Sequence, residues 1–410
     1  MPPPAAAPPR SEPLRVVFWG TYDLSKPRNR ILLAGLRANG VQVDECHASI
    51  WEHVRDKGTL APGRIARHLV RTALAYPSLL VRFWRGPAPD VVLVGYLGQL
   101  DVLLLCPFAR LRGIPVVWDQ FISLYDTVVC DRRKLAPRHP LARLLHAGEW
   151  AACRAADRVL MDTREHAAYV ARTFGLDSAR VESVWVGAET QSFPPARPRP
   201  EQDGPMTVLF YGQLIPLHGV DTIIRAARLM RARPIQFVLI GSGQEEGRVR
   251  AMLAEEPLAQ LEWLPWVEYE QLIERIERAD VCLGIFGSTD KAARVIPNKV
   301  FQIVAARRPL ITRDSPAIRE LLGSDDEGVW LVPPADPGAL ASALESLLQR
   351  GARLRHVRGR DRRDDVSPRA IGRQLLDVLE RVTRGERPPA AALPPSAAAP
   401  SPRAPQSSHT

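Results

Sequence analysis

Several features that would place the chain in a familiar class are missing from its sequence. The five cysteines form no C-x-x-C pair and their number is odd, so neither a disulfide framework nor a zinc site is indicated. No apolar run reaches the ~18 residues of a membrane-spanning helix. The sequence has no zinc-finger spacing, no aromatic–glycine RNA-binding signature and no basic region leading into heptads. These absences predict a reduced, cytoplasmic protein without a nucleic-acid partner.

The chain does have an excess of positive charge and a length that favours two domains. Its 410 residues include 55 Lys and Arg against 45 Asp and Glu, which gives a net charge of +10. This charge suits an anionic ligand or an anionic membrane surface, although an arginine-rich, solvated surface explains it equally well. At roughly 150 residues per domain, the length predicts two domains or more.

Stretches rich in proline divide the chain. Those at the two ends are also rich in Ala and Ser and bury too little apolar surface to fold, so we expect disordered tails there. A third stretch in mid-chain is the expected hinge between domains. We therefore predict a tail, a first domain, a linker, a second domain, a segment with a last helix and a second tail, at residues 1–12, 13–195, 196–205, 206–355, 356–385 and 386–410.

Both predicted domains repeat one pattern, in which short apolar runs alternate with amphipathic helices. The first domain has strand-like runs such as 14–20 and 114–119, separated by helical stretches such as 99–111. The pattern restarts at 206–212 and continues to a helix at 337–350. The predicted fold class is α/β, with two Rossmann-like doubly wound domains that face a cleft. The carboxyl ends of the strands are the expected ligand edge of each domain.

Two loops of the second domain have residues suited to an anionic ligand. Gly212 and Gly219 bracket a loop that follows one strand, and Gly241 and Gly243 follow the next. These glycines allow tight turns and close approach of a ligand, and His218 could donate a hydrogen bond to phosphate. The second loop is one residue longer than the dinucleotide fingerprint, which argues against a dehydrogenase. Plain strand-to-helix turns and a surface histidine are the alternatives.

The segment IPNKVFQIVAARRPLIT, residues 296–312, combines a helix N-terminus with basic side chains. Asn298 and Lys299 occupy the expected first turn, and Lys291 and Arg294 lie just upstream. A lysine acts as a point charge on phosphate, so the segment favours an anion beside the two glycine loops. A solvated helix start is the alternative for Lys299.

Taken together, these motifs resemble the donor domain of a GT-B glycosyltransferase. The segments GQLIPLHG, LIGSG, WLPWVEYEQLIERIERADVCLGIF and IPNKVFQIVAARRPLITRD carry the resemblance, which is strong over 206–350 and looser before it. Within GT-B the chain resembles family four, the retaining enzymes, and more narrowly the members with IPNK in place of the usual acidic loop. The resemblance implies a nucleotide-sugar donor held between the domains and transfer without a metal or other cofactor. The D-x-D motif, with which the other common transferase fold holds a metal, is missing.

The sequence departs from this family at four positions. Gln213 and His218 stand where the family usually has an Arg and a Lys. Arg294 and Gln302 stand where it has two glutamates. We infer that positive charge has moved to Arg294 and Lys299. Gln302 still suits ribose hydroxyls, but more weakly than a carboxylate, because charge-assisted hydrogen bonds are stronger.

The resemblance places the acceptor side in the first domain. Gly20 remains in a loop that lies over the donor phosphates in the family, and Arg28 and Arg30 suit either phosphate or a solvated helix start. Asp119 stands where relatives have a His or Asp near the reacting sugar, and Asp126 is a second candidate for orienting the acceptor hydroxyl. A role for Asp119 as an N-cap or a hydrogen-bonded core residue is equally favoured. The expected reaction is same-face attack, in which the leaving phosphate takes the proton.

Residues 64–86 mix arginines with aliphatic and aromatic side chains, as does a helix that lies in a membrane interface. An ordinary helix packed on the first domain is equally favoured. In the first case the acceptor is expected to be lipid-linked, and the protein to work at the inner face of the cell membrane.

The leading hypothesis is a glycosyltransferase that acts in polysaccharide or glycolipid assembly, on a lipid-linked or saccharide acceptor. One alternative keeps the fold but makes the protein a sugar-nucleotide epimerase. The other is a catalytically inactive GT-B scaffold, which the substitutions at Gln213, Arg294 and Gln302 favour.

Overall fold

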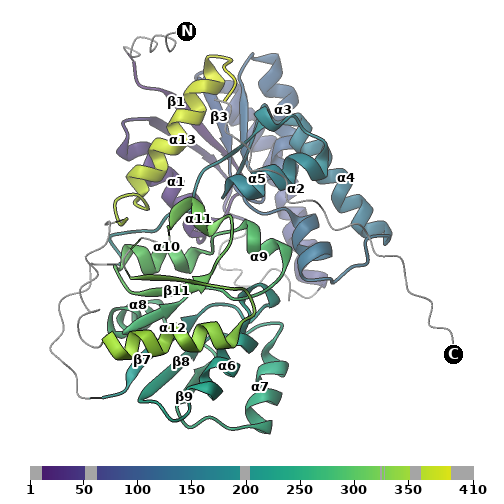
Figure 1. Ribbon diagram of the computed structural model, residues 1–410. Coiled ribbons are helices and arrows are strands. Elements are labelled where there is room, and N and C mark those ends of the chain that lie inside the picture. The colour runs from purple at the N-terminus through teal and green to yellow at the C-terminus, as the bar shows by residue number, and fades with distance from the viewer. Residues whose placement is uncertain are drawn as a thin grey trace.

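The computed structural model describes residues 12–50, 62–193, 204–323, 326, 328–350 and 362–388, and contains two parallel sheets (Figure 1). Each sheet has six strands, in the orders β2-β1-β3-β4-β5-β6 and β12-β11-β10-β7-β8-β9. All neighbouring strands are parallel, and in each sheet the order in which the chain adds strands changes direction once near the middle, as in a doubly wound fold. The predicted fold class, two Rossmann-like α/β domains, is confirmed. Most of the two predicted tails and of the linker lies outside the described residues.

The first domain is built on the six strands β1 to β6. Their bounds are β1 Arg15–Gly20, β2 Gln42–His47, β3 Val91–Val94, β4 Val116–Asp119, β5 Arg158–Met161 and β6 Val181–Ser183. The helices between them are α1 Pro27–Ala38, α2 Pro62–Arg85, α3 Gln99–Leu111, the π-helical turn η2 Asp126–Asp131, α4 Pro140–Ala155, α5 Arg164–Phe174 and the short η3 Ser178–Arg180.

The second domain repeats the arrangement. Its strands are β7 Met206–Tyr211, β8 Ile235–Ile240, β9 Leu261–Leu264, β10 Val281–Leu283, β11 Leu310–Arg313 and β12 Val329–Val332. Its helices are η4 Pro216–His218, α6 Val220–Leu229, α7 Glu246–Glu255, α8 Tyr269–Arg278, α9 Asp290–Arg294, α10 Asn298–Ala305, α11 Ile318–Leu321 and α12 Pro337–Arg350.

Apolar periodicity accounts for most of these elements. The predicted helices at 99–111 and 337–350 are α3 and α12, and their buried residues recur at helical spacing. Helix α7 was not among the predicted helices, and its apolar face is short: Val249 is its one fully buried residue, and Met252 and Leu253 pack beside it. None of the helices in the described residues is long and apolar enough to cross a membrane.

Two apolar layers cover the faces of the first sheet. Side chains of α2, α3, α4 and α5 pack on one face, and side chains of α1 pack on the other together with the last helix, α13 (Pro368–Thr383). The sequence left open where α13 packs. Figure 1 shows it in the first domain beside α1, so the chain returns from the second domain to the first.

Two glycines allow α1 and α13 to approach this closely. A Cβ atom added to Gly372 would lie 2.1 Å from the backbone of Gly35, and one added to Gly35 would lie 2.2 Å from the carbonyl oxygen of Pro368. The helices therefore touch backbone to backbone at this crossing. Ser367 begins α13 as its N-cap, since its side chain accepts a hydrogen bond from Ala370 N.

We expect Gly372→Ala to lower the free energy of unfolding by about 1–3 kcal/mol, because the added methyl group must push the helices apart. Urea denaturation measures the change. Gly247→Ala is the matched control, since Gly247 lies in α7 with no atom within 4 Å of an added Cβ. A helical Gly→Ala change in open space stabilises by up to about 1 kcal/mol. Equal effects of the two substitutions would contradict the close helix crossing.

Candidate functional site

The loops that follow β7 and β8 meet backbone to backbone at the carboxyl edge of the second sheet. Gly212 N donates to Ile240 O at 2.9 Å, and Leu214 N donates to Ser242 O at 3.0 Å. A Cβ added to Gly241 would lie 1.9 Å from Gly212 O. Only glycine permits this approach, and we call the surface formed by Gly212, Gly241 and Gly243 the glycine edge.

Lys299, in the first turn of α10, reaches the glycine edge. Its side chain crosses the Phe210 ring with Nζ 3.7 Å from the ring centroid. A Cβ added to Gly212 would lie 3.0 Å from Nζ. Lys299 is 5% exposed, and Nζ has no hydrogen-bond partner among the described residues. The alternative considered for Lys299, a solvated helix start, is therefore wrong for this side chain.

Burial lowers the pKa of Lys299 well below its ordinary value of 10.5. The cause is desolvation, because the ring contact replaces only part of the lost hydration of the ammonium group. An unpaired amine in such a place costs free energy, and a nearby anion would reduce that cost.

His218 lies beside Lys299 at Gly212, where an added Cβ would lie 3.1 Å from His218 Cε1. Its Nδ1 is hydrogen-bonded to Gln213 O, and since a carbonyl oxygen only accepts, Nδ1 must carry the proton. Burial, with the charge of Lys299 as the second cause, lowers the pKa of His218 well below 6.5. The neutral ring then leaves Nε2 as an acceptor. The expectation that His218 donates to phosphate therefore needs a correction: it holds only if an anion first drives protonation of Nε2.

Gln213, Asn298 and Gln302 are further residues that were predicted to bind the donor. Asn298 and Gln302 are half-buried on α10, and Gln213 is exposed. Gln213 Oε1 accepts a hydrogen bond from Arg132 of the first domain at 3.4 Å. The structure thus brings Gly212, Gly241, Gly243, Gln213, His218 and Lys299 to one edge of the second sheet, and Asn298 and Gln302 lie on the helix that contains Lys299.

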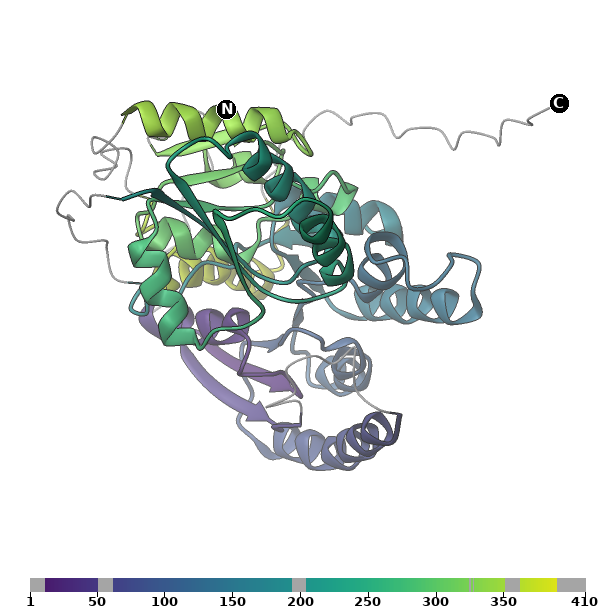
Figure 2. The same ribbon diagram turned by 90° about the horizontal axis from the view of Figure 1, so that it is seen from below.

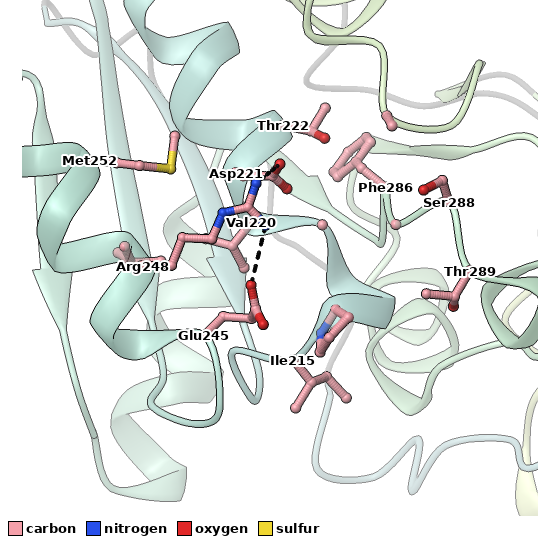
Figure 3. A pocket seen from close by; sticks show the side chains of 15 residues that line it. Ile215, Val220, Asp221, Thr222, Glu245, Arg248, Met252, Phe286, Ser288 and Thr289 are labelled. Atoms are coloured by element: carbon pink, nitrogen blue, oxygen red, sulfur yellow. Dashed lines mark hydrogen bonds and ion pairs between the residues drawn. The ribbon is translucent and has the colours of Figure 1, made fainter. Parts of the chain in front are cut away.

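A pocket of about 280 Å³ opens beside this group (Figure 3). The start of α6, part of α7 and residues 286–289 line it, and none of the predicted donor-binding residues does. Figure 3 shows Arg248 between Asp221 and Glu245, with ion pairs of 3.0 and 3.4 Å. These carboxylates disfavour a diphosphate in the pocket itself.

A second group of charges joins the two domains. Asp126, at the start of η2 in the first domain, is fully buried and forms ion pairs with Lys291 Nζ at 3.2 Å and Arg294 Nη2 at 3.0 Å. Both cations come from α9 of the second domain. We call Asp126, Lys291 and Arg294 the interdomain cluster. It brings together a residue predicted to be catalytic and one predicted to bind the donor.

The environment of the interdomain cluster keeps Asp126 charged. Burial works against its charge, but the two cations outweigh burial and lower the pKa of Asp126 below 3.8. Lys291 Nζ also donates to Thr127 Oγ1 at 2.6 Å, and Arg294 lies 3.7 Å from the centroid of the Tyr169 ring. Arg294 is thus held by the first domain and not by the glycine edge.

Glu149 positions Asp126 and was missed by sequence reasoning. It is buried on α4 and accepts hydrogen bonds from Ser123 Oγ at 2.6 Å and from Leu124 N at 2.6 Å. Ser123 Oγ in turn accepts from Asp126 N at 3.0 Å. A glutamate within an amphipathic helix resembles an ordinary surface charge, so nothing in the sequence marked it.

Asp119 is a core residue in this structure. It is fully buried and paired with Arg28, whose Nη2 lies 2.6 Å from Oδ1. Arg28 also donates to Val184 O and Trp185 O. Of the two roles left open for Asp119, the structure favours the hydrogen-bonded core residue. Arg28 is fully occupied in the same way, so the phosphate contact considered for it does not fit.

Gly20 and Arg30 also have partners within the first domain. A Cβ added to Gly20 would lie 2.3 Å from Asp101 Oδ2, so this glycine makes room for the buried Asp101 of α3. Arg30 forms two hydrogen bonds of 2.8 Å with Glu189. The structure gives Gly20 a packing role.

Among the described residues, no group of three or more His, Cys, Asp or Glu side chains is arranged to hold a metal ion. The five cysteines are free, in keeping with their spacing.

Comparison with known proteins bears on both domains. Residues 205–350 match the family described as glycosyl transferases group 1. Among solved structures, sucrose-phosphate synthase of Thermosynechococcus elongatus covers 92% of this chain and all of its own, with a TM-score of 0.64 and 17% identity. The Anabaena protein HepE, solved with UDP and glucose, covers 90% of this chain and 99% of its own, with a TM-score of 0.58 and 12% identity. The chain has the GT-B fold.

Curated relatives of this GT-B chain are glycosyltransferases. A D-inositol 3-phosphate glycosyltransferase of Acidothermus cellulolyticus is 31% identical over 52% of this chain and 50% of its own. An MMP alpha-(1->4)-mannosyltransferase of Mycolicibacterium hassiacum is 24% identical over 78% of this chain and 82% of its own. The chain spans about half the length or less of the first curated relatives it matches. The two solved structures are only 17% and 12% identical to this chain, so their similarity shows the fold alone.

We expect Asp126→Asn to destabilise the GT-B chain by about 3–5 kcal/mol, because the amide leaves two partly buried cations without a carboxylate. Since the folded-state pKa lies below the ordinary 3.8, this contribution is complete above pH 3.8 and is lost as the pH falls through the folded-state value. Urea denaturation of the wild type and of Asp126→Asn measures this difference at several pH values between about 2 and 7, a range that includes the titration of a carboxyl group.

The matched control for Asp126→Asn is Asp314→Asn. Asp314 pairs with Arg319 at 2.7 Å, and both side chains are exposed. Solvent weakens such a pair to about 0–1 kcal/mol. Equal losses of unfolding free energy in Asp126→Asn and Asp314→Asn would show that the interdomain cluster stabilises the protein no more than an exposed ion pair does.

Lys299→Met is expected to raise the free energy of unfolding at pH 7 by about 1–3 kcal/mol, the cost of a buried polar group without a partner. The folded-state pKa is depressed, so the unfolded chain binds the extra proton and wild-type stability rises with pH up to about 10.5. The advantage of the variant should therefore shrink toward pH 10. A variant less stable than the wild type at pH 7 would contradict the unpaired state of Nζ.

Proposed function

We propose that the protein transfers a sugar from a nucleotide-sugar donor to an acceptor, with the donor diphosphate bound at Lys299. The observation that carries this proposal is the buried Lys299 amine beside the glycine edge, for which the described residues provide no hydrogen-bond acceptor. It lies in the domain that matches group 1 glycosyltransferases. A buried basic side chain at the carboxyl edge of the strands, where doubly wound domains bind their ligands, suits an anionic substrate.

A diphosphate meets the physical needs of this place. Its negative charge would pair with the Lys299 ammonium group and restore the pKa that burial depresses. The N-terminus of α10, where Asn298 and Lys299 lie, adds a favourable dipole for an anion. The tight glycine edge lets an extended phosphate chain approach the backbone. Gln302, half-buried on the same helix, is our candidate for the ribose hydroxyls.

The transfer is proposed to retain the anomeric configuration and to need no metal. Lys299 and the α10 N-terminus supply positive charge where a metal would otherwise stabilise the leaving diphosphate. Asp119 is paired with Arg28, and Asp126 with two cations, so neither is a free nucleophile or base. Same-face attack, with the leaving phosphate accepting the proton of the acceptor hydroxyl, needs no protein base.

Arg294 can contact the donor only by exchanging partners. In the structure its guanidinium is held by Asp126 and Tyr169 of the first domain. A donor phosphate would have to replace the Asp126 carboxylate as its anion. We propose that this exchange links donor binding to the contact between the two domains, with Lys291 holding Asp126 during the exchange.

The chemistry of the relatives suggests which ligands to try. HepE was solved with UDP-glucose, and the matched curated proteins are named for transfer to inositol phosphate or for a mannosyl linkage. We propose a hexosyl donor, and an acceptor that is a saccharide or a lipid-linked sugar of polysaccharide or glycolipid assembly.

The test is a thermal-shift screen with UDP-glucose, GDP-mannose and other nucleotide sugars. A true donor at ~100 times its dissociation constant should stabilise the wild type by about 2.7 kcal/mol. Lys299→Met should lose most of this gain, measured against its own ligand-free stability, because the paired charge is gone. Lys134→Met is the matched control, since Lys134 is exposed and lies in the first domain.

Turnover assays then separate the reactions. Transfer predicts nucleoside diphosphate release that needs an acceptor and survives EDTA, and NMR of the product reports the anomeric configuration. Conversion of the donor without an acceptor would instead show an epimerase. Donor binding without turnover would favour the inactive scaffold, which the full pairing of Asp119 and Asp126 also suits. A gain unchanged in Lys299→Met would remove the role assigned to Lys299.

A further inference from the structure

Helices α2 and α3 share one face of the first sheet. Tyr76, Leu79 and Phe83 of α2 pack in the same core cluster as Val102 and Leu105 of α3. Arg112, at the end of α3, donates to the carbonyl oxygen of Phe83, which joins the ends of the two helices. Because both helices turn one side to the same sheet, their opposite sides face outward together.

The outward sides of α2 and α3 are also apolar. On α2, residues 70, 74, 81 and 84 recur at helical spacing, opposite the buried stripe, and on α3 residues 100, 104, 108 and 111 do the same. Leu74 is 73% exposed and Leu111 76%. We call these side chains the outer stripe: Val70, Leu74, Val81, Trp84, Leu100, Leu104, Phe108 and Leu111.

The exposed charged side chains that α2 and α3 themselves contribute are all basic. α2 contains no Asp or Glu, and the single acidic residue of α3, Asp101, is buried and hydrogen-bonded to Tyr76 and Thr21. Arginines border the stripe instead, and those with an exposed side chain in the structure are Arg71, Arg82, Arg85 and Arg110. The guanidinium group of Arg112 also lies 5.9 Å from the Trp84 ring.

The outer stripe, with arginines at its border, extends along both helices. Isolated exposed apolar residues are normal, but a continuous set of them marks a surface that contacts something else. Figure 2 shows α2 at the outer margin of the first domain, where a large partner has access.

We propose that the outer stripe docks the protein on an anionic lipid bilayer. Leucine, valine and phenylalanine side chains would enter the boundary between head groups and acyl chains, and Trp84 suits the same depth because its ring is amphipathic. The arginines would meet anionic head groups. This inference goes beyond the transfer reaction and does not depend on it. If both hold, the acceptor is lipid-linked.

A second copy of the chain suits this surface less well. A two-fold contact through the outer stripe pairs the same patch on both copies. It would bring Arg71, Arg82 and Arg85 of one copy near those of the other, with no acidic side chain on α2 to offset them. Anionic lipids provide the missing charge.

The test is cosedimentation of the full-length protein with vesicles of phosphatidylcholine, with and without phosphatidylglycerol. We expect binding to the anionic vesicles that falls as salt rises, and little binding to pure phosphatidylcholine. Two double variants probe the two components: Leu74→Glu with Leu111→Glu, and Arg71→Glu with Arg85→Glu. Each should weaken binding about tenfold or more, since each reverses a contribution to it.

The matched control is Leu229→Glu with Arg225→Glu, an exposed leucine and an exposed arginine on α6 of the second domain. It should bind vesicles as the wild type does. Circular dichroism melting and nucleotide thermal shifts check that every variant is folded with an intact donor site, so this proposal and the transfer reaction fail separately.

Three results would overturn the proposal. One is equal binding to both kinds of vesicle, which would deny the role of the arginines. Another is a failure to bind either kind. A third is a dimer in analytical ultracentrifugation that Leu74→Glu with Leu111→Glu dissociates, without vesicle binding, which would assign the surface to a second copy.

Discussion

The buried carboxylate of Asp126 is stabilised by two cations, and both come from the other domain. Asp126 belongs to the first domain and its two partners, Lys291 and Arg294, to the second. An unpaired charge at this depth would cost several kcal/mol, so the domains meet where the three side chains can touch. Glu149 and Ser123 hold the turn that presents Asp126. The cluster therefore ties the relative position of the domains to the charges near the proposed donor site.

The glycine edge and the interdomain cluster use positive charge in opposite ways. Lys291 and Arg294 are paired with Asp126, whereas Lys299 contacts an aromatic ring and has no hydrogen-bonded anion in the described part of the chain. The first arrangement holds domains together, and the second suits a bound phosphate. Histidine 218, neutral and hydrogen-bonded to Gln213 O, keeps its remaining ring nitrogen at the same edge. The proposed donor chemistry follows from this contrast more than from the number of basic residues.

Most of the fold could be predicted from local patterns. The helix that begins at Ser367, the strand-to-helix alternation and the helices α3 and α12 all follow from apolar periodicity and capping residues. The convergence of the β7 and β8 loops also follows, because parallel strands end at one edge. Side-chain partners could not be predicted in the same way. Asp119 with Arg28 and Asp126 with Arg294 lie 91 and 168 residues apart, and nothing local marks such pairs.

The sequence by itself determined the class of fold and the glycine loops and basic residues that follow strands of the second domain, since these depend on spacing and composition. The tertiary structure alone decided which cations are available. In the folded chain Lys299 is buried beside Gly212, Arg294 forms an ion pair with Asp126, and Arg28 is buried in an ion pair with Asp119. The tertiary structure also turned the apolar sides of α2 and α3 outward together. The physical reason is that charge and apolar surface act through distance and burial, which only the folded chain establishes.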